Sequence, residues 1–485
     1  MNDTRVAVVA GGRTYSYGDL DRASRRAAGA LLDGSVDLDQ ARVAFFVQPG
    51  FEYVAVQRGI WRAGGVAVPL AVSHPPPELE YVIRDSGAAI VVADTFSADV
   101  LAPIAAAAGT RFIATDAVLA GAAATVLPHL GAPRRAMIIY TSGTTARPKG
   151  VVTTHANIGA QIASLVEAWE WTPADRLLLA LPLHHVHGII NGLGSALAVF
   201  AACEILEAFD AATIWRRLAS GDVTVFTAVP TMYHRLIAAW DAAPEDVKLS
   251  WSQGARRVRL MMSGSAALPV QTLERWRQIS GHVLLERYGM TEIGMALSNP
   301  LHGERRPGHV GMPLPNVQVR LVDEEGGEVA PGTPGEIEVR GPNVFQEYWR
   351  RPDATAEAFR GGWFRTGDVA VVEDGYYRIL GRRSVDIIKS GGYKISALEI
   401  EEVLRTHPAI TECAVVGVDD VEWGERICAA VELADGAELA LPELQAWARD
   451  HLAPYKLPRD LRAVSALPRN AMGKVTKPDV AKLFT

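Results

Sequence analysis

Patterns of buried strands and amphipathic helices alternate through the first part of this chain. Strand patterns occur at Arg42–Val47, Ile90–Ala93 and Arg111–Ala114, and helix patterns begin near Asp19 and Phe51. Strands that alternate with helices in this way form parallel sheets with helical crossovers. The same strand signal recurs further along the chain at 177–180, 223–226 and 260–262. We therefore expect an α/β fold built on parallel sheets.

The length of 485 residues exceeds what one ordinary hydrophobic core serves, so we expect at least two domains. Beyond Val310, apolar and polar residues alternate at 317–322 and 335–340 between Gly and Pro turns, which is typical of antiparallel strands. A last block has its own strand and helix patterns, at 413–416 and 441–452. The sequence thus predicts a large N-terminal domain over 1–381, with parallel α/β sheets and an antiparallel β subdomain. A small α+β C-terminal domain follows over 382–485.

Composition narrows the class of protein further. A formal net charge of -7 argues against nucleic-acid binding as the main role. The cysteines Cys203, Cys413 and Cys428 lie far apart, which fits a reducing cytosol and gives no disulfide or metal framework. The longest apolar run, 188–202, contains polar residues and is shorter than the roughly 20 residues that a membrane span needs. With no charged, apolar leader at the start, we expect a cytoplasmic protein, no membrane partner and a buried helix in this run.

The segment from Tyr140 to Gly150 carries the first chemical signal. It follows the apolar run 136–139 and contains four Ser or Thr hydroxyls, two glycines and Lys149. A strand that ends in such a loop presents backbone N–H groups, hydroxyl groups and a cation at one point, as polyphosphate sites do. The common P-loop needs Gly-Lys followed by Ser or Thr, and here Lys149 lies between Pro148 and Gly150. Alone, the segment is also compatible with a flexible surface turn.

Five further clusters occur at 181–188, 262–269, 286–292, 363–368 and 468–474. Their sequences are LPLHHVHG, MSGSAALP, ERYGMTE, WFRTGD and PRNAMGK. Together with the Ser/Thr-rich loop, and in this order, they resemble the acyl-adenylate-forming superfamily of acyl-CoA synthetases, carrier-linked adenylation domains and luciferases. The resemblance covers nearly the whole chain. It implies a two-step reaction in which a carboxylate attacks the α-phosphate of ATP and a thiol then displaces AMP.

The resemblance implies a set of ATP-binding residues: Thr141, Ser142, Gly143, Thr144, Thr145, Lys149, Gly264, Ser265, Ala266, Glu286, Arg287, Tyr288, Gly289, Met290, Thr291, Asp368, Arg382 and Lys474. ATP brings about four negative charges toward an anionic acid, so the site must neutralise charge first. Glu292 and Thr144 are implied as the Mg²⁺ residues, since hard oxygen ligands suit that ion. Tyr288 is expected to stack on adenine, and Asp368 to accept the ribose hydroxyl groups. Without the family context, Asp368 also reads as a turn aspartate.

Lys474 is implied as the residue that stabilises the α-phosphate during adenylate formation and leaves afterwards. Such a residue belongs on a mobile domain, for which the segment 381–386 offers a hinge. The superfamily often has Asp or Lys where Ser384 stands, and usually has glycine where Ala146 stands. A coenzyme A tunnel is implied at Ser390, Gly391, Gly392, Tyr393 and Lys394, where two glycines allow a narrow pantetheine arm to pass.

The acyl side of the site is implied by the segments around His185, Ser263 and Met290. The sequence Val229–Leu236 borders the acyl pocket in this superfamily, and Arg235 within it suits a second carboxylate better than a hydrocarbon tail. Arg235 could also point outward along a helix. The Tyr-His-Arg-Leu segment, the clusters at 263–265 and 286–288, and the short chain are similar to malonyl-CoA synthetases, which act on malonate and methylmalonate. We therefore expect Arg235 and Ser263 to hold the distal carboxylate, and Lys474, Glu292, Thr144 and His185 to be catalytic.

The identity of the thiol that accepts the acyl group is inferred from the segment after Lys474. We expect no carrier domain there, because only a few residues follow Lys474. Coenzyme A is the simplest thiol, so the expected ligands are ATP, Mg²⁺, coenzyme A and a small dicarboxylic acid. Three alternatives stay open: a fatty or short-chain monocarboxylate acyl-CoA synthetase, a stand-alone adenylation enzyme that loads a carrier protein, and a non-catalytic nucleotide-binding protein. The last predicts that one of Thr144, Glu292, Asp368 or Lys474 is missing, and none is.

Overall fold

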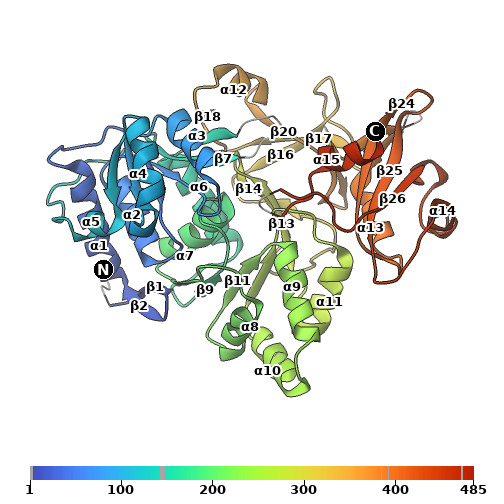
Figure 1. The fold of residues 1–485 in the computed structure, drawn as a ribbon, viewed down its shortest axis with the longest axis horizontal. Coiled ribbons are helices and arrows are strands. Elements are labelled where there is room, and N and C mark those ends of the chain that lie inside the picture. The colour runs from blue at the N-terminus through green and yellow to red at the C-terminus, as the bar shows by residue number, and fades with distance from the viewer. Residues whose placement is uncertain (1–3, 142–147, 384, 391–392, 471–472) are drawn as a thin grey trace. The chain divides into compact units, whose positions relative to one another are not determined.

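The fold was examined in a computed structural model (Figure 1) that describes residues 4–141, 148–383, 385–390, 393–470 and 473–485. The chain divides into two compact units. The first comprises Met1–Gln318 and Val339–Phe364, and the second comprises Val319–Glu338 and Arg365–Thr485. Each unit is described by itself.

The larger sheet of the first unit has, within the described residues, nine strands in the order β15-β14-β13-β12-β11-β9-β10-β1-β2. These strands are β1 Val6–Ala10, β2 Arg13–Ser16, β9 Arg176–Leu179, β10 Ala202–Ile205, β11 Val225–Ala228, β12 Leu260–Ser263, β13 Leu285–Met290, β14 Gly294–Ser298 and β15 Met312–Pro313. From β1 through β10, β9, β11 and β12 to β13 the pairing is parallel, and antiparallel strands close both ends. Parallel pairing places the carboxyl ends of β11 and β12 at one edge, where ligands commonly bind.

The second sheet of this unit has the order β18-β8-β7-β4-β3-β5-β6 within the described residues. Its strands are β3 Arg42–Phe46, β4 Val66–Pro69, β5 Ile90–Ala93, β6 Arg111–Ala114, β7 Arg135–Thr141, β8 Lys149–Thr154 and β18 Glu347–Tyr348. Strands β3 to β6 and β7 pair in parallel, whereas β7 and β8 form an antiparallel hairpin that is extended by β18. The Ser/Thr-rich segment therefore connects two paired strands.

Two α-helices of the first unit begin at capping boxes. Its α-helices are α1 Tyr17–Leu32, α2 Phe51–Arg62, α3 Pro76–Ser86, α4 Ala98–Ala107, α5 Thr115–Ala120, α6 His155–Ala168, α7 Ser195–Ala198, α8 Ala211–Ser220, α9 Pro230–Asp241, α10 Glu245–Ala255, α11 Val270–Ser280 and α12 Pro352–Ala358. Ser16 and Thr154 form capping boxes at α1 and α6, which satisfy N–H groups that the helix itself leaves unpaired. Helices α8 to α11 lie together beside β11 in Figure 1, and Trp215, Trp276 and Tyr233 are buried in their core.

The second unit contains a sheet of order β23-β22-β25-β24, with β26 paired to β25. Its strands are β22 Ile387–Ser390, β23 Tyr393–Ser396, β24 Ile410–Asp420, β25 Gly424–Leu433 and β26 Asp460–Ala463, and its α-helices are α13 Ala397–Leu404, α14 Leu441–Ala448 and α15 Lys477–Ala481. A further sheet of order β16-β17-β20-β19, with β21 beside β20, crosses the boundary between the units. Its strands are β16 Gln318–Val322, β17 Gly335–Arg340, β19 Phe359–Arg360, β20 Trp363–Glu373 and β21 Tyr376–Arg382.

The predicted fold class is confirmed, with parallel α/β sheets followed by antiparallel strands and a small α+β region. The run 188–202 differs from the single buried helix that was expected. A π-helix spans His187–Gly194 and is followed by α7. At the end of the run, Ala202 begins β10 and pairs with Arg176 of β9. The domain boundary between 381 and 382 stays a prediction. Within the described residues, no helix combines the length and the apolar character required to cross a bilayer.

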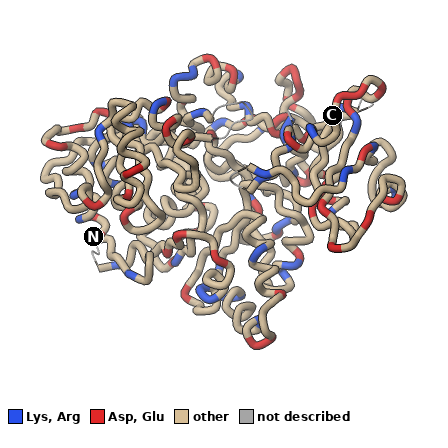
Figure 2. Tube along the Cα trace, in the orientation of Figure 1, with Lys and Arg blue, Asp and Glu red and all other residues tan. Residues whose placement is uncertain are grey.

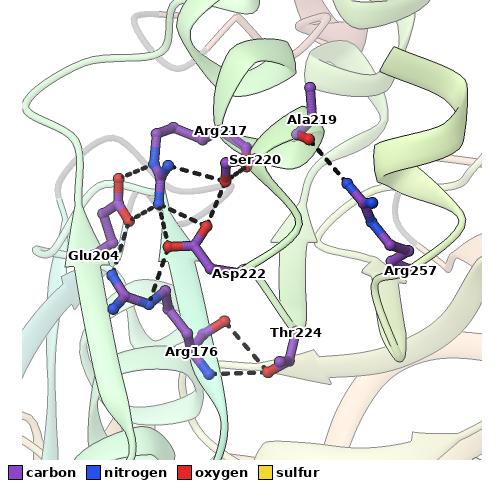
Figure 3. Close-up of polar contacts among 8 residues, drawn as sticks. All are labelled: Arg176, Glu204, Arg217, Ala219, Ser220, Asp222, Thr224 and Arg257. Atoms are coloured by element: carbon purple, nitrogen blue, oxygen red, sulfur yellow. Dashed lines mark hydrogen bonds and ion pairs between the residues drawn. The ribbon is translucent and has the colours of Figure 1, made fainter. Parts of the chain in front are cut away.

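Charged residues of both signs are interspersed along the trace in Figure 2. One cluster ties α8 to strands β9 and β10 of the larger sheet (Figure 3), and in it Arg217 lies between Glu204 and Asp222. Arg217 Nη2 lies 2.7 Å from Glu204 Oε2 and 3.0 Å from Asp222 Oδ1. Arg176 reaches the same two carboxylates at 3.5 and 3.6 Å. Two guanidinium groups thus neutralise two carboxylates, of which Glu204 is buried.

Candidate active site

The Ser/Thr-rich segment connects the ends of the β7–β8 hairpin. Thr141 and Lys149 are direct partners in this antiparallel pair, so the hairpin brings both ends of the segment together. The predicted phosphate-binding residues Ser142, Gly143, Thr144 and Thr145 lie outside the described residues. Lys149 places its ammonium 5.2 Å from the centre of the Tyr348 ring, a distance at which a cation and an aromatic face attract.

Tyr348 connects this lysine to Glu292, the predicted Mg²⁺ residue. Its hydroxyl donates a hydrogen bond of 2.9 Å to Glu292 Oε1, and the backbone carbonyl of Glu292 accepts one of 2.7 Å from the N–H of Phe345. Glu292 is buried. Tyr348 lies beside Lys149 because β18 pairs with β8. A fixed carboxylate fits Mg²⁺ that arrives with phosphate oxygens and water, which is how this ion usually binds.

Arg287 lies at the centre of a buried polar network in the first unit. Only 4% of its surface is exposed, and its Nη2 contacts Nε2 of His187 closely. Burial lowers the pKa of this guanidinium to about 10, against a smaller opposing effect of Tyr233. Gly264 passes so near that a Cβ there would lie 1.9 Å from Arg287 Nη1, so this position excludes a side chain. Among the described residues, no carboxylate pairs with Arg287.

His187 accepts a hydrogen bond through one ring nitrogen and donates one through the other. Because Arg287 donates to Nε2, the proton of the neutral ring is assigned to Nδ1, which donates to Ser265 Oγ at 3.0 Å. The Thr227 hydroxyl completes the set with a hydrogen bond of 2.8 Å to Nε2. His187 is the first residue of the π-helix, a feature that often occurs at functional sites. Sequence reasoning missed both His187 and Thr227.

Ser263 ends β12 beside this network. It faces Glu286 across the β12–β13 pair and lies next to Gly264. Its hydroxyl is buried, and in the described part of the chain it has no hydrogen-bond partner. An orphaned buried hydroxyl costs free energy unless a ligand or water pairs with it. The role of Ser263 in holding the acid substrate stays a prediction.

The ERYGMTE segment forms most of β13 and the turn that follows. Glu286 is buried, and its Oε1 accepts a hydrogen bond of 2.9 Å from the N–H of Gly308, so part of its role is to hold a loop. The residues that follow are half-buried, which suits contact with a ligand: Tyr288, Gly289, Met290 and Thr291. Ala266, in the neighbouring loop, is exposed.

His185, the histidine that was predicted to be catalytic, belongs to a different group. Its ring lies 4.1 Å from that of His184, and the His184 ring lies 5.9 Å from that of His74. Burial, followed by the nearby His185 and His74, lowers the pKa of His184 to about 3. Over the described ranges, no cluster of three His, Cys, Asp or Glu residues could hold a metal ion. The catalytic role of His185 stays a prediction.

Arg235 lies on the exposed face of α9, whereas the buried face of this helix contains Pro230, Tyr233 and Leu236. Its guanidinium lies 5.8 Å from the centre of the Phe209 ring. This arrangement corresponds to the alternative in which Arg235 points outward along the helix. It removes the geometric reason for choosing Arg235 as the carboxylate residue.

The second unit brings Asp368, Arg382 and Lys474 together. Asp368 and Arg382 are register partners in the β20–β21 pair, and Arg382 Nε donates to Asp368 Oδ1 at 3.1 Å. Lys474 lies in a tight turn, in which its N–H donates to Asn470 Oδ1 at 3.0 Å. Its side chain retains exposed surface, yet loss of hydration and then the charge of Arg382 lower the pKa of its ammonium. The charge of Arg382 therefore acts on the ammonium of Lys474.

Of the predicted coenzyme A residues, Ser390 ends β22 and Tyr393 begins β23. Ser390 and Tyr393 are partners in this antiparallel pair; Ser390 is buried, and Tyr393 is exposed. The Tyr393 ring stacks on that of Tyr455, with the two centres 4.3 Å apart. Gly391 and Gly392, and the side chain of Lys394, lie outside the described residues.

Comparisons with known proteins identify the family of the chain. The AMP-binding enzyme family matches residues 1–349, and its C-terminal domain family matches residues 399–474. A protein of Xenopus laevis named malonate–CoA ligase ACSF3, mitochondrial, is 48% identical over 90% of this chain and 82% of its own. An Arabidopsis thaliana malonate–CoA ligase is 43% identical over 99% of this chain and 86% of its own.

Among solved structures, ATP-bound MatB from Rhodopseudomonas palustris aligns with a TM-score of 0.92 at 36% identity, over 100% of this chain and 96% of its own. The o-succinylbenzoate CoA synthetase MenE from Bacillus subtilis aligns with a TM-score of 0.86 at 28% identity, over 99% and 96%. A family match over well above half of the chain, together with relatives of this identity and coverage, leads to one assignment. The chain belongs to the AMP-binding enzyme family.

Proposed function

We propose that this protein is an acid–thiol ligase that joins malonate, or a 2-substituted malonate such as methylmalonate, to coenzyme A at the expense of ATP. A carboxylate oxygen of the acid attacks the α-phosphorus and pyrophosphate leaves; the thiol sulfur then attacks the acyl carbon and AMP leaves. The observation that carries the proposal is the 43–48% identity to proteins named malonate–CoA ligase. This identity extends over 90–99% of the chain.

The residues expected at the site are proposed to supply the charge neutralisation that this reaction needs. Lys149 and the preceding segment, including Ser142 to Thr145, are proposed to hold the phosphates, and Asp368 the ribose. Glu292, with Thr144, is proposed to hold Mg²⁺, which when bound neutralises phosphate charge. Lys474 is proposed to stabilise the charge that develops on the α-phosphate, with Arg382 beside it. Ser390 to Lys394 are proposed to contact coenzyme A.

The specificity for a second carboxylate is proposed to lie in Arg287 rather than Arg235. A buried guanidinium without a carboxylate partner is costly, and an anion that enters the site offsets that cost. Arginine suits this task because its planar group grips a carboxylate through two parallel hydrogen bonds. His187, Ser265 and Thr227 hold the Arg287 side chain in place, and Ser263 offers a further hydroxyl.

A matched pair of variants tests this assignment. Loss of a buried charge partner costs about 3 kcal/mol or more, so Arg287→Met should lower kcat/KM for malonate at least about a hundredfold. Its KM for ATP and its turnover of a short monocarboxylate such as propionate should change little. Arg235→Met, at an exposed position, should behave like the unaltered protein toward every acid.

Selective loss of malonate turnover in Arg235→Met, with Arg287→Met unaffected, would restore the original assignment. A rise in the KM for ATP in Arg287→Met would instead assign this residue to the nucleotide. The acid panel also separates the alternatives, because a monocarboxylate ligase prefers propionate or a longer acid. An enzyme that loads a carrier protein forms the adenylate but no thioester with free coenzyme A. A cytoplasmic location stays part of the proposal, and fractionation of cells that express the chain tests it.

A further inference from the structure

Lys477, three residues after Lys474, takes part in a buried ion cluster that the reaction itself does not require. Its Nζ lies 2.7 Å from Asp386 Oδ1 and 2.7 Å from Glu401 Oε1. The three side chains are only 12%, 14% and 5% exposed. Burial opposes the charge of Lys477, but Glu401 and Asp386 outweigh it and raise the pKa of the ammonium. Lys477 therefore stays charged and tied to two separate elements.

Glu401 provides the fixed end of this cluster. It lies in α13, and the Oε1 that binds Lys477 also accepts a hydrogen bond of 2.8 Å from the N–H of Val415 in β24. Arg405 lies 3.4 Å from the other carboxylate oxygen. The start of α15 is thus anchored to the central sheet of the second unit through Lys477 and Glu401.

Asp386 provides the other end, at the segment that was predicted to be the hinge. Its Oδ2 accepts a hydrogen bond of 2.9 Å from the N–H of Arg382, while its own N–H donates to the Arg382 carbonyl at 2.7 Å. Gly381 has a φ of +128° and approaches Asp386 so closely that a Cβ there would lie 2.3 Å from the Cβ of Asp386. One carboxylate therefore joins the end of β21 to Lys477.

The same short path leads to the proposed nucleotide residues. Arg382 donates to Asp368 at 3.1 Å, and its positive charge contributes to lowering the pKa of the Lys474 ammonium. Lys474 lies in the turn between Arg469 and Val475, which are bridge partners, and this turn is followed directly by Lys477. The clasp formed by Lys477, Asp386 and Glu401 is thus the link between the turn that carries Lys474 and the strand end that carries Arg382.

We propose that Lys477 and Asp386 are positioning residues for adenylate formation: their buried ion pair sets the Lys474 turn against the end of β21, so that Lys474 and Arg382 address one phosphate. This inference rests on the proposed function, because it assigns Lys474 to the first half-reaction. Displacement of a catalytic group by about 1 Å can lower a rate about a hundredfold. The second half-reaction, in which Lys474 is not needed, should depend far less on the clasp.

The test separates the two half-reactions in the full-length protein. Adenylate formation is measured as pyrophosphate exchange with a panel of acids that includes malonate. Thioester formation is measured with coenzyme A and the chemically prepared acyl-adenylate. Lys477→Met should slow adenylate formation at least about tenfold, mainly in kcat, and leave thioester formation within about twofold. Lys477→Arg, which keeps the charge, should recover part of the loss.

Lys482→Met is the matched control, because Lys482 forms an ion pair of 2.7 Å with Asp479 just beyond α15, with 74% and 47% of the two side chains exposed. It should leave both half-reactions unchanged. Should Lys477→Met not fold, Asp386→Asn provides the same comparison, since an amide keeps the shape and the acceptor for the Arg382 N–H.

Equal losses in both half-reactions at matched folded fractions would show a merely structural role, and unchanged adenylate formation would also overturn the inference. Failure of the proposed function looks different. If the proposed function is wrong, the unaltered protein activates another acid from the panel and not malonate. The effect of Lys477→Met is then measured with that other acid.

Discussion

The hydrogen bond from Tyr348 to Glu292 allows a magnitude to be worked from the structure. Tyr348→Phe deletes only the hydroxyl that donates to Glu292 Oε1 at 2.9 Å, and the ring that lies 5.2 Å from the Lys149 ammonium remains. A hydrogen bond to a charged group is worth about 1.5–3 kcal/mol. Without it, Glu292 loses that much preference for its present orientation, and the same free energy must be supplied when the magnesium nucleotide binds.

Because about 1.36 kcal/mol corresponds to a tenfold change in rate, kcat/KM for MgATP should fall between about tenfold and 150-fold. The Mg²⁺ concentration for half-maximal pyrophosphate release should rise in parallel. Tyr377→Phe is the control, since it removes a buried hydroxyl that donates to the neutral carbonyl of Val319 at 3.3 Å. It should lower stability by about 1 kcal/mol and leave the Mg²⁺ dependence unchanged.

A result in which Tyr348→Phe keeps both its Mg²⁺ dependence and its kcat/KM within about twofold of the unaltered protein, at equal folded fraction, would refute this reasoning. Glu292 would then owe its orientation to other contacts, and the assignment of Tyr348 as the residue that links Lys149 to the metal carboxylate would fail.

Three further predictions follow from named contacts. Lys474→Ala should lower adenylate formation about a hundredfold to a thousandfold while thioester formation from supplied adenylate persists, which stopped-flow or quench assays of each half-reaction measure. The pKa of His184 is about 3 in the folded protein and ordinarily 6.5, so between these values the imidazole takes up a proton only in the unfolded chain. The free energy of unfolding should therefore fall as the pH drops from about 6.5 toward 3. Urea titrations should show a shallower decline for His184→Gln. Arg217→Met leaves Glu204 and Asp222 with the longer contacts to Arg176, and Asp222 also keeps the Ser220 hydroxyl; it should cost about 2 kcal/mol in urea unfolding. Arg216→Met, at an exposed position of the same helix, should cost less than about 0.5 kcal/mol.

Sequence patterns predicted the architecture well because they report burial directly. Arg42–Val47 and Ile90–Ala93 were expected as buried strands, and they are β3 and β5. The helix expected from Phe51 to Ala63 is α2, which ends one residue earlier, at Arg62. Apolar periodicity gives this information without reference to the rest of the chain.

The site was less accessible to sequence reasoning, because its contacts join distant parts of the chain. Tyr348 lies 56 residues from Glu292, and only the pairing of β18 with β8 places it beside Lys149. The π-helix that begins at His187 could not be anticipated from three histidines within four positions. The three histidines in the cluster at 181–188 indicated a binding region. Their local spacing does not say which of the three rings faces the strand ends.

Arg235, the residue expected to hold the distal carboxylate, shows the same limit. A helix pattern allows Arg235 to face either way. The outcome depends on Tyr233 and Leu236, which occupy the buried face of α9 and leave Arg235 outside. Arg287, which was expected as a nucleotide residue, lies in the buried first half of β13, between β12 and β14 in the large sheet.

A comparison of Arg217 with Arg287 supports the proposal that Arg287 holds a charge for the substrate. Arg217 meets two carboxylates, and those partners raise its pKa despite partial burial (Figure 3). Arg287 is more deeply buried, meets only neutral groups among the described residues, and has its pKa lowered to about 10. A fold gains nothing from an uncompensated buried cation, since a well-packed apolar side chain would be more stable. The cation is useful only when an anion arrives, and a small acid with a second carboxylate supplies one while its first carboxylate remains available to react.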